Sequence, residues 1–206
     1  MAQKTVDSKI DRVIISLDGT TQETYAQYRR GGTLEKVLEG SINLVEAKRK
    51  TQSKTPYIVF QYLVVKPNEH EIEDAKQLAK EIGVDEITFK TAQVYEYENG
   101  NELIPTIEKY SRYIKKTNGT YKLKRKAPLD NCWRMWHSAV ITWDGKVVPC
   151  CFDKDGQYEM GNINKDSFLK VWQNMAYNTF RSSLLNGREN IPMCENCTEG
   201  TTTYSQ

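Results

Sequence analysis

The stretch Tyr57-Ile-Val-Phe-Gln-Tyr-Leu-Val-Val65 decides the fold class of this chain. It is almost continuously apolar, which is typical of a strand in a sheet that is covered on both faces. Pro67 ends the strand, and Asn68 with Glu71 three residues later predicts a capping box at the start of a helix. Gly83 is a natural end for this helix. The predicted helix carries its apolar residues on one face: Ile72, Ala75, Leu78, Ala79 and Ile82.

The same alternation of strand and helix patterns continues on both sides of this strand and helix. Upstream, residues 12–17 form a short β-branched run that closes at Asp18-Gly19. Downstream, residues 86–90 predict a third strand. The order β-α-β-α-β predicts an α/β fold with parallel strands. A second predicted helix lies between the first two strands and has apolar residues at helical spacing: Leu34, Val37, Leu38, Ile42 and Val45.

Residues 96–127 are more polar and predict a linker. Within this linker, Leu103 to Ile114 predict a short helix. The basic run Lys122-Leu-Lys-Arg-Lys126 is typical of a solvated face.

The sequence pattern changes from Cys132 onward, where it predicts a hairpin followed by a helix. Residues 139–143 and 146–148 flank Asp144-Gly145, which is a strong hairpin signal. A two-residue turn would pair Trp143 with Lys146 and would bring Cys150 beside Ala139. Asp166 predicts the cap of a helix that contains Phe168, Val171, Trp172 and Met175.

The chain has five cysteines, and all of them follow residue 130. Clustered cysteines in a protein that is not secreted favour metal or redox chemistry over disulfides. The candidate ligands are Cys132, Cys150, Cys194 and Cys197, the last two at the C-x2-C spacing of a metal knuckle. Adjacent residues of a strand point to opposite faces, so Cys150 is assigned as the ligand and Cys151 is interpreted as structural. His137 is interpreted as a packed residue. Spacing alone does not separate zinc from an iron–sulfur cluster, and buried free cysteines are the simpler alternative.

Composition excludes several function classes. The 29 basic and 27 acidic residues give a net charge of +2, which provides no argument for binding nucleic acid or an anionic membrane. No stretch approaches the roughly 20 apolar residues that span a bilayer. Residues 1–10 have no apolar core of a signal peptide. We therefore expect a cytoplasmic protein.

The segment from Cys132 to Cys197 resembles the SPASM domain, the auxiliary-cluster extension of radical SAM enzymes. The matching order is Cys132, twelve residues, Gly145, four residues and Cys150, then residues 160–163, residues 167–172, and Cys194-x2-Cys197. The resemblance implies that these cysteines are ligands of an auxiliary [4Fe-4S] cluster.

The first half is similar to the C-terminal part of the radical SAM partial barrel. Three stretches carry this resemblance: Ser16-Leu-Asp-Gly19, Tyr28-Arg29-Arg-Gly-Gly32 and Val64-Val-Lys-Pro-Asn68. The resemblance implies that Ser16 and Asp18 lie near the ribose or amino group of S-adenosylmethionine. It implies that Arg29 pairs with the carboxylate, for which a planar guanidinium is suited.

Two departures from the family pattern limit these implications. The C-x3-C-x2-C motif that holds the SAM-reducing cluster is absent, and only four cysteines match a pattern of seven. We expect a piece of a longer enzyme that is inactive by itself and holds one auxiliary cluster at most. The expected divisions are a barrel part (1–95), the linker (96–127) and a SPASM-like domain (128–206).

The resemblance also implies the partners and the substrate class. We expect the missing N-terminal barrel half as a partner, a peptide or protein as substrate, and self-association through the open edge of the first strand. The alternative from another class is a non-enzymatic zinc module with four cysteine ligands, which would serve a structural or interaction role.

Overall fold

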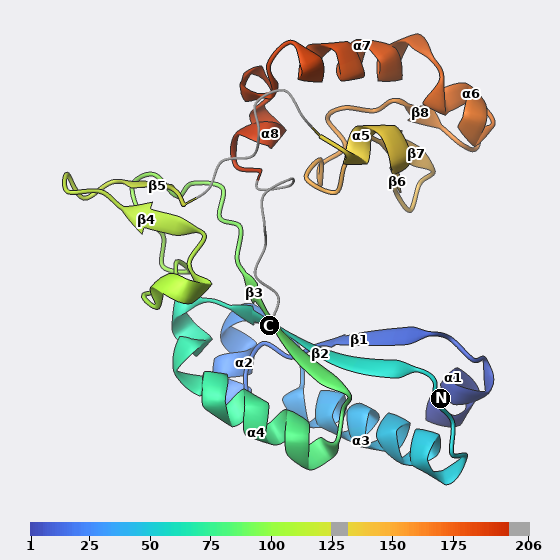
Figure 1. Ribbon diagram of the computed structural model, residues 1–206, viewed down its shortest axis with the longest axis vertical. Coiled ribbons are helices and arrows are strands. Elements are labelled where there is room, and N and C mark those ends of the chain that lie inside the picture. Colours follow the sequence, from blue (N-terminus) through green and yellow to red (C-terminus); the bar gives the residue numbers. More distant parts are fainter. Residues whose placement is uncertain (125–131, 198–206) are drawn as a thin grey trace. The chain divides into compact units, whose positions relative to one another are not determined.

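The computed structural model of the protein describes residues 1–124 and 132–197. The chain divides into two compact units, and the described residues 1–124 and 132–197 belong to the N-terminal and the C-terminal unit, respectively (Figure 1). None of the helices in these two ranges has the length and apolar character that crossing a membrane requires.

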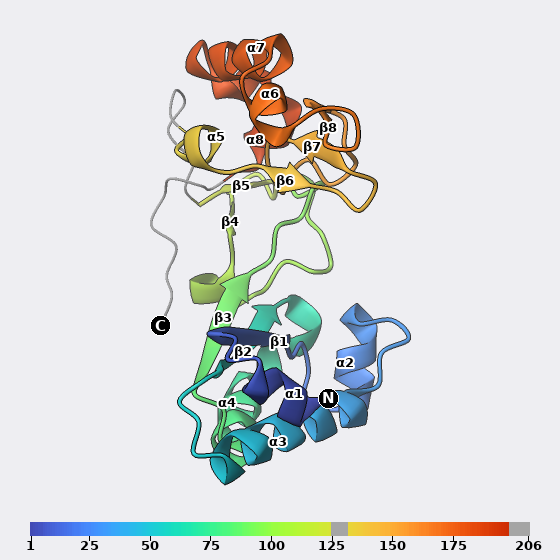
Figure 2. The same ribbon diagram turned by 90° about the vertical axis from the view of Figure 1, so that its right-hand side faces the viewer.

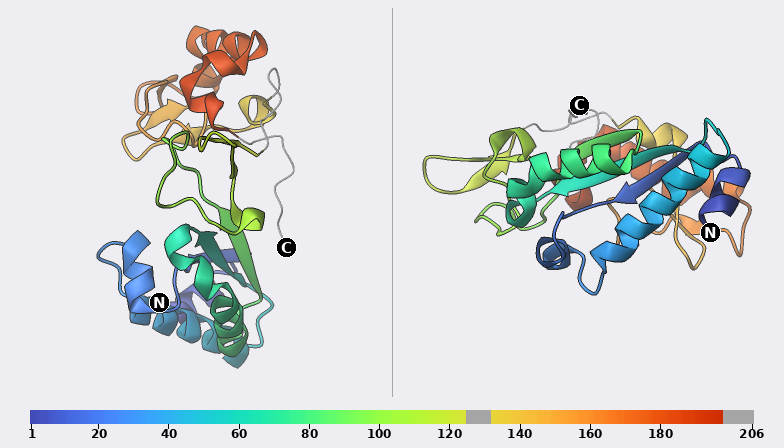
Figure 3. Two further views of the ribbon diagram at one scale, coloured as in Figure 1. Left: turned by 90° about the vertical axis from the view of Figure 1, so that its left-hand side faces the viewer. Right: turned by 90° about the horizontal axis from the view of Figure 1, so that it is seen from below.

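A three-stranded parallel sheet is the centre of the N-terminal unit. Its strand order is β1 (Arg12–Ser16), β2 (Tyr57–Val64) and β3 (Glu86–Thr91), with Ile15 opposite Phe60 and Phe60 opposite Ile87. The helices α3 (Leu34–Lys50) and α4 (Ile72–Ile82) lie together on one face of the sheet (Figure 3). The predicted α/β fold with parallel strands is confirmed.

Every second residue of β2 contributes its side chain to the core of this unit. Ile58, Phe60, Tyr62 and Val64 are buried among apolar residues of the neighbouring helices. The other residues of β2 after Tyr57 are buried or half-buried, whereas Ile14 on the outer strand β1 is 53% exposed. The central strand is therefore enclosed, and the edge strand is not.

Two short helices complete the N-terminal unit. α1 (Ala2–Asp7) packs through Val6 beside α3 (Figure 2). α2 (Gln22–Tyr28) begins after Thr21, whose Oγ1 accepts a hydrogen bond from the amide of Thr24 at 3.2 Å.

The predicted capping box at Asn68 and Glu71 is wrong. A 3-10 helix, η1 (Lys66–Glu71), contains both residues and leads into α4. Asn68 Oδ1 accepts from the amide of Val65 at 2.8 Å, whereas Glu71 accepts from Thr20 and Thr21 near the start of α2. The two side chains bond to residues before the helix and elsewhere in the chain because tertiary partners compete with local capping.

Residues 92–124 form a small cluster of their own. The predicted helix over 103–114 is wrong, because only η2 (Glu108–Tyr110) is helical there, and β4 (Tyr113–Lys115) pairs with β5 (Tyr121–Leu123). Tyr113 is the centre of the cluster: its hydroxyl accepts from the Val94 amide at 2.7 Å and donates to the Val94 carbonyl at 2.9 Å. The basic run is not wholly solvated, since Leu123 is buried, and its last two residues lie outside the described ranges.

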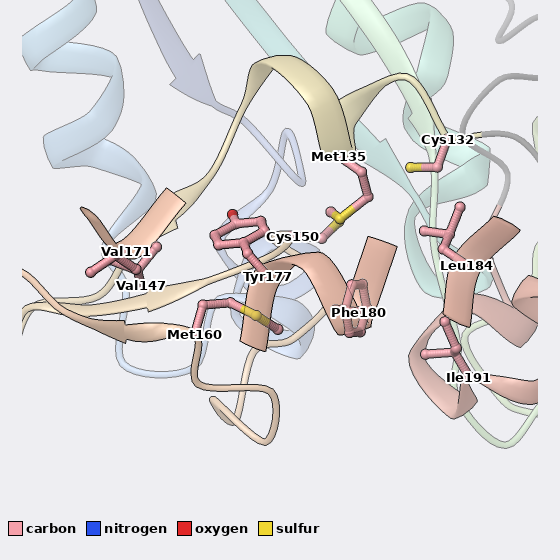
Figure 4. Close-up of a cluster of buried hydrophobic side chains, with 10 residues drawn as sticks. All are labelled: Cys132, Met135, Val147, Cys150, Met160, Val171, Tyr177, Phe180, Leu184 and Ile191. Atoms are coloured by element: carbon pink, nitrogen blue, oxygen red, sulfur yellow. The ribbon is translucent and has the colours of Figure 1, made fainter. Parts of the chain in front are cut away.

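The C-terminal unit combines a small antiparallel sheet with short helices. The sheet has the order β6 (Val140–Ile141), β7 (Lys146–Val148) and β8 (Gly161–Asn162). The helical elements are α5 (Arg134–His137), α6 (Phe168–Trp172), α7 (Met175–Leu185), η3 (Arg188–Asn190) and α8 (Pro192–Glu195). Their buried side chains form one core, in which Tyr177 of α7 lies near Met160, the residue before β8, and Leu184 lies near Cys132 and Ile191 (Figure 4).

The predicted hairpin exists, but the predicted register is off by one residue. Val140 lies opposite Val148, and the Thr142 amide donates to the Lys146 carbonyl at 2.9 Å. The loop therefore has three residues, with Gly145 alone at positive φ (+82°). A type I turn followed by a left-handed glycine gives this geometry, so Asp144 does not need the positive φ that a two-residue turn demands.

The helix after this sheet begins one residue later than predicted and ends earlier. Ser167, rather than Asp166, caps α6, and its hydroxyl accepts from the Lys170 amide at 3.4 Å. Met175 lies in α7, which is capped by Asn174. Asn174 also donates from Nδ2 to the Met160 carbonyl at 2.7 Å and so ties α7 to the residue before β8.

Candidate metal centre

The four predicted cysteine ligands line one pocket of the C-terminal unit. Cys132 precedes α5, Cys150 follows β7, Cys194 lies in α8 and Cys197 follows α8. Cys132 and Cys150 belong to the core drawn in Figure 4. The free space in the pocket is only about 10 Å³, roughly enough for one water molecule. The structure thus brings together residues that are up to 65 positions apart, from 132 to 197.

Local turns fix the direction of each cysteine. The Met135 amide donates to the Cys132 carbonyl at 3.1 Å, and the Asp153 amide donates to the Cys150 carbonyl at 3.1 Å. At the C-x2-C pair, the Cys197 amide donates to the Cys194 carbonyl, also at 3.1 Å. Each cysteine therefore stands at the start of a tight turn or within one, where short chain segments can present a thiol to a common centre.

Burial separates the candidate ligands from the fifth cysteine. Cys132, Cys150 and Cys197 are 8%, 9% and 5% exposed. Cys194 is half-buried and Cys151 is exposed. Cys151 does not line the pocket, and its sulfur lies 3.9 Å from Nη1 of Arg134. His137 was predicted to be packed, but it is exposed, and its ring lies 4.5 Å from that of the exposed Trp133.

The thiols do not converge on a single point. Within residues 1–124 and 132–197, no three His, Cys, Asp or Glu side chains are arranged to hold one metal ion. Four sulfurs on one zinc ion would each lie about 2.3 Å from it. The donor set of the pocket is four thiols, which suits a zinc ion or an iron–sulfur cluster.

Burial also sets the protonation of these thiols. It raises the pKa of Cys150 to about 12 and the pKa of Cys194 to about 11. At Cys194 the nearby guanidinium of Arg188 acts in the opposite direction. Without a bound cation these two thiols keep their protons at neutral pH, so metal binding would release protons.

Two arginines in the pocket were not predicted from the sequence. Arg134 and Arg188 both line it, together with apolar residues that include Met135, Phe180 and Leu184. Arg188 is only 3% exposed. The sequence offers one weak signal for it, its place six residues before Cys194, because a buried arginine and an exposed one look alike in a sequence.

The three predicted SAM contacts lie in the N-terminal unit, and two of them bond to each other. Asp18 is 1% exposed and accepts hydrogen bonds from Nε of Arg29 at 2.5 Å and from the Leu63 amide at 2.9 Å. Arg29 keeps a side chain that is 41% exposed. Ser16 is the last residue of β1, opposite Gln61, and is half-buried. The buried carboxylate thus holds a guanidinium that still reaches solvent.

Asn68 and Glu71 extend this polar network, a role that the sequence analysis missed. Asn68 donates from Nδ2 to the carbonyls of Asp18 at 3.0 Å and Leu63 at 2.9 Å. Glu71 accepts from the Thr20 amide at 2.6 Å. Burial alone would raise the pKa of Glu71, but hydrogen bonds from its threonine neighbours outweigh burial and lower it. These bonds fix the segments that follow β1 and β2.

Comparison with known proteins identifies the second half of the chain. Residues 132–198 match SPASM, an iron–sulfur cluster-binding domain. Over 96% of its length, the chain is 24% identical to the tungsten-containing aldehyde ferredoxin oxidoreductase cofactor-modifying protein of Pyrococcus furiosus. A 60-residue stretch is 37% identical to the S-adenosyl-L-methionine-dependent 2-deoxy-scyllo-inosamine dehydrogenase of Niallia circulans and covers 29% of this chain and 24% of that protein. The second half of the chain is thus similar to SPASM domains, and the comparisons support a radical SAM/SPASM-type protein. The resemblance drawn from the cysteine motifs is thereby confirmed.

The fold of the chain also matches a solved structure. The structure of anSMEcpe with AdoMet bound superimposes with a TM-score of 0.57 at 14% identity, over 98% of this chain and 61% of that one. The chain also spans 61% of the length of the Pyrococcus furiosus relative. The SPASM match implies that the cysteine-rich half binds an iron–sulfur cluster.

Proposed function

We propose that this chain is the C-terminal part of a radical SAM/SPASM enzyme, and that Cys132, Cys150, Cys194 and Cys197 hold one auxiliary [4Fe-4S] cluster. The observation that carries the proposal is the single pocket that all four thiols line. The match of residues 132–198 to an iron–sulfur cluster-binding domain supports a cluster over a zinc ion, and each cysteine of a cubic cluster would bind a different iron atom. When bound, the cluster would accept an electron or bind part of the substrate.

The residues around the thiols are suited to such a group. Met135, Phe152, Phe180 and Leu184 provide an apolar lining, which excludes water and lowers the local dielectric constant. The thiols come from three separate segments of the chain, so the pocket could adjust by small movements of these segments. Cys151 is exposed and outside this lining, which supports Cys150 as the ligand of the adjacent pair.

For the N-terminal unit we propose a segment of the radical SAM partial barrel that contacts S-adenosylmethionine. The fold likeness to anSMEcpe supports the barrel assignment. Arg29 would meet the SAM carboxylate with the part of its guanidinium that Asp18 leaves exposed. Asp18 is almost fully buried and would act by holding Arg29. Ser16, at the end of β1, would lie near the ribose or amino group.

The parent reaction would be hydrogen abstraction from a substrate by a 5′-deoxyadenosyl radical, with a peptide or protein as the proposed substrate class. The relatives named above are a cofactor-modifying protein and an inosamine dehydrogenase, so neither name supports that class. The proposed partner is the N-terminal barrel half. Among the described residues β1 pairs only with β2, which supports docking or self-association at its open edge.

Anaerobic reconstitution of the full chain with ferrous iron and sulfide tests the cluster assignment. We expect about four iron and about four sulfide ions per chain, with an EPR signal after reduction. Changing any one of the four ligands to serine should abolish stable uptake, whereas Cys151→Ser should leave it intact. Binding of one zinc ion with no uptake of iron and sulfide would instead favour the non-enzymatic zinc module.

A further inference from the structure

Arg188 places a positive charge inside the cysteine pocket. It is 3% exposed and lines the same pocket as the four thiols. Its side chain is hydrogen-bonded to Cys194. A positive charge that is this well buried acts strongly on its neighbours, because little solvent screens it.

The backbone fixes the position of Arg188 relative to Cys194. Gly187 turns the chain from α7 into η3 at φ +131°, a conformation that residues with a side chain rarely adopt. The Arg188 carbonyl accepts from the Ile191 amide at 3.1 Å, and the Ile191 carbonyl accepts from the Cys194 amide at 2.7 Å. Two successive turns thus link the arginine to the ligand, so their separation is set by short-range geometry.

The charges along the pocket have one sign. Arg134 and Arg188 are the charged residues that line it, and no aspartate or glutamate does so among the described residues. Four thiolates outweigh the positive charge of an iron–sulfur core, so the liganded cluster is an anion and gains a further negative charge on reduction. A buried cation beside it stabilises the reduced form more than the oxidised form.

We propose that Arg188 is a positioning residue for the auxiliary cluster, which hydrogen-bonds the Cys194 ligand and raises the reduction potential of the cluster. The inference rests on the proposed cluster at these four cysteines. Arg134 makes a matched comparison, because it lines the same pocket but is half-buried and contacts the sulfur of the exposed Cys151. More solvent screens its charge, so its effect is smaller.

The test compares Arg188→Gln, Arg188→Lys and Arg134→Gln in the full chain, reconstituted anaerobically with ferrous iron and sulfide. The readout is a potentiometric titration followed by EPR. For Arg188→Gln we expect the ratio of reduced to oxidised cluster at a fixed potential to fall at least about tenfold, which corresponds to about 59 mV for a one-electron couple. Arg188→Lys should recover most of this loss, and Arg134→Gln should change the ratio less than Arg188→Gln.

The outcomes separate this inference from the proposed function. Equal potentials in Arg188→Gln and the unmodified chain would overturn the tuning role, and so would equal potentials in Arg188→Gln and Arg188→Lys. Loss of the cluster in both Arg188 variants, with normal loading in Arg134→Gln, would make Arg188 a structural residue only. Failure of the unmodified chain to take up iron and sulfide would instead refute the cluster itself.

Discussion

The two units of this protein differ in how they satisfy their buried polar groups. In the N-terminal unit the buried carboxylates of Asp18 and Glu71 accept hydrogen bonds from the protein itself. In the C-terminal unit the pocket gathers four thiols and the guanidiniums of Arg134 and Arg188. The two carboxylates of the first unit are thus satisfied within the protein, whereas the four thiols of the second would be satisfied by a bound metal group.

The largest expected effect tests the dependence of the C-terminal unit on its metal. In the loaded protein we expect Cys197→Ser to unfold residues 130–200 and to spare residues 10–95, because a small domain relies on its metal for stability. All four tryptophans of the chain follow residue 132, so their fluorescence reports on this unit alone. Backbone amide exchange reports on both units.

Cys151→Ser is the control for this variant, because Cys151 is exposed and lies outside the pocket. It should leave the fluorescence and the amide exchange unchanged. If Cys197→Ser left amide exchange unchanged across both units, the C-terminal unit would be shown to fold without its metal.

A smaller effect is expected from breaking the polar network of the N-terminal unit. Asp18→Asn replaces a carboxylate that accepts from Arg29 and Leu63 with an amide that can accept through one oxygen only. We expect the free energy of unfolding of this unit to fall by about 3 kcal/mol. The urea midpoint, followed by amide exchange in β1 and β2, measures it.

Changing an exposed ion pair gives the matched control for Asp18→Asn. Glu73→Gln removes the pair between Glu73 and Lys76 on the surface of α4, and should cost less than about 0.5 kcal/mol. Tryptophan fluorescence should not change in either variant. A loss at Asp18→Asn as small as that at Glu73→Gln would mean that the buried pair contributes no more than a surface pair.

The smallest expected effect is a dependence of the N-terminal unit on pH. The pKa of Glu71 is lowered in the folded state, while an unfolded glutamate has a pKa of about 4.3. The folded state therefore binds fewer protons, and Glu71 stabilises it above about pH 4.3. This contribution is lost as the pH falls through the folded pKa.

Glu71→Gln should remove this part of the acid dependence and lower the stability at pH 7 by about 1–2 kcal/mol. Urea midpoints between about pH 3 and 7, measured for Glu71→Gln and for the unmodified chain, test this acid dependence. Parallel curves for Glu71→Gln and the unmodified chain would contradict the assignment. The tryptophan signal of the C-terminal unit should be the same in both.

Local sequence signals predicted the elements whose partners are close along the chain. The apolar run at 57–65 became β2 at Tyr57–Val64, and the helical spacing from Ile72 to Ile82 became α4 with these bounds. The C-x2-C spacing and the hairpin signal identified four thiols that do line one pocket. For the strand and the helix the apolar pattern repeats within a few residues, so periodicity alone predicts them.

The predictions that were wrong concern residues whose structure depends on a distant partner or on a choice between similar turns. Asn68 and Glu71 have a local capping pattern, yet they bond to residues 50 and 51 positions away. Asp144-Gly145 suggested a two-residue turn, but a three-residue loop uses the same glycine and shifts every pair by one position. Arg188 had only the weak signal of its place six residues before Cys194, because burial depends on what packs around a residue.

The sequence by itself determined the α/β pattern of the first half, the hairpin, and the four thiols of the second half, because spacing in the chain encodes which residues share a face or a turn. The tertiary structure alone decided that Asp18 holds Arg29, that Cys151 faces solvent, and that Arg188 lies beside Cys194. Each of these depends on the burial of a polar or charged group, and burial is a property of neighbours brought together by folding.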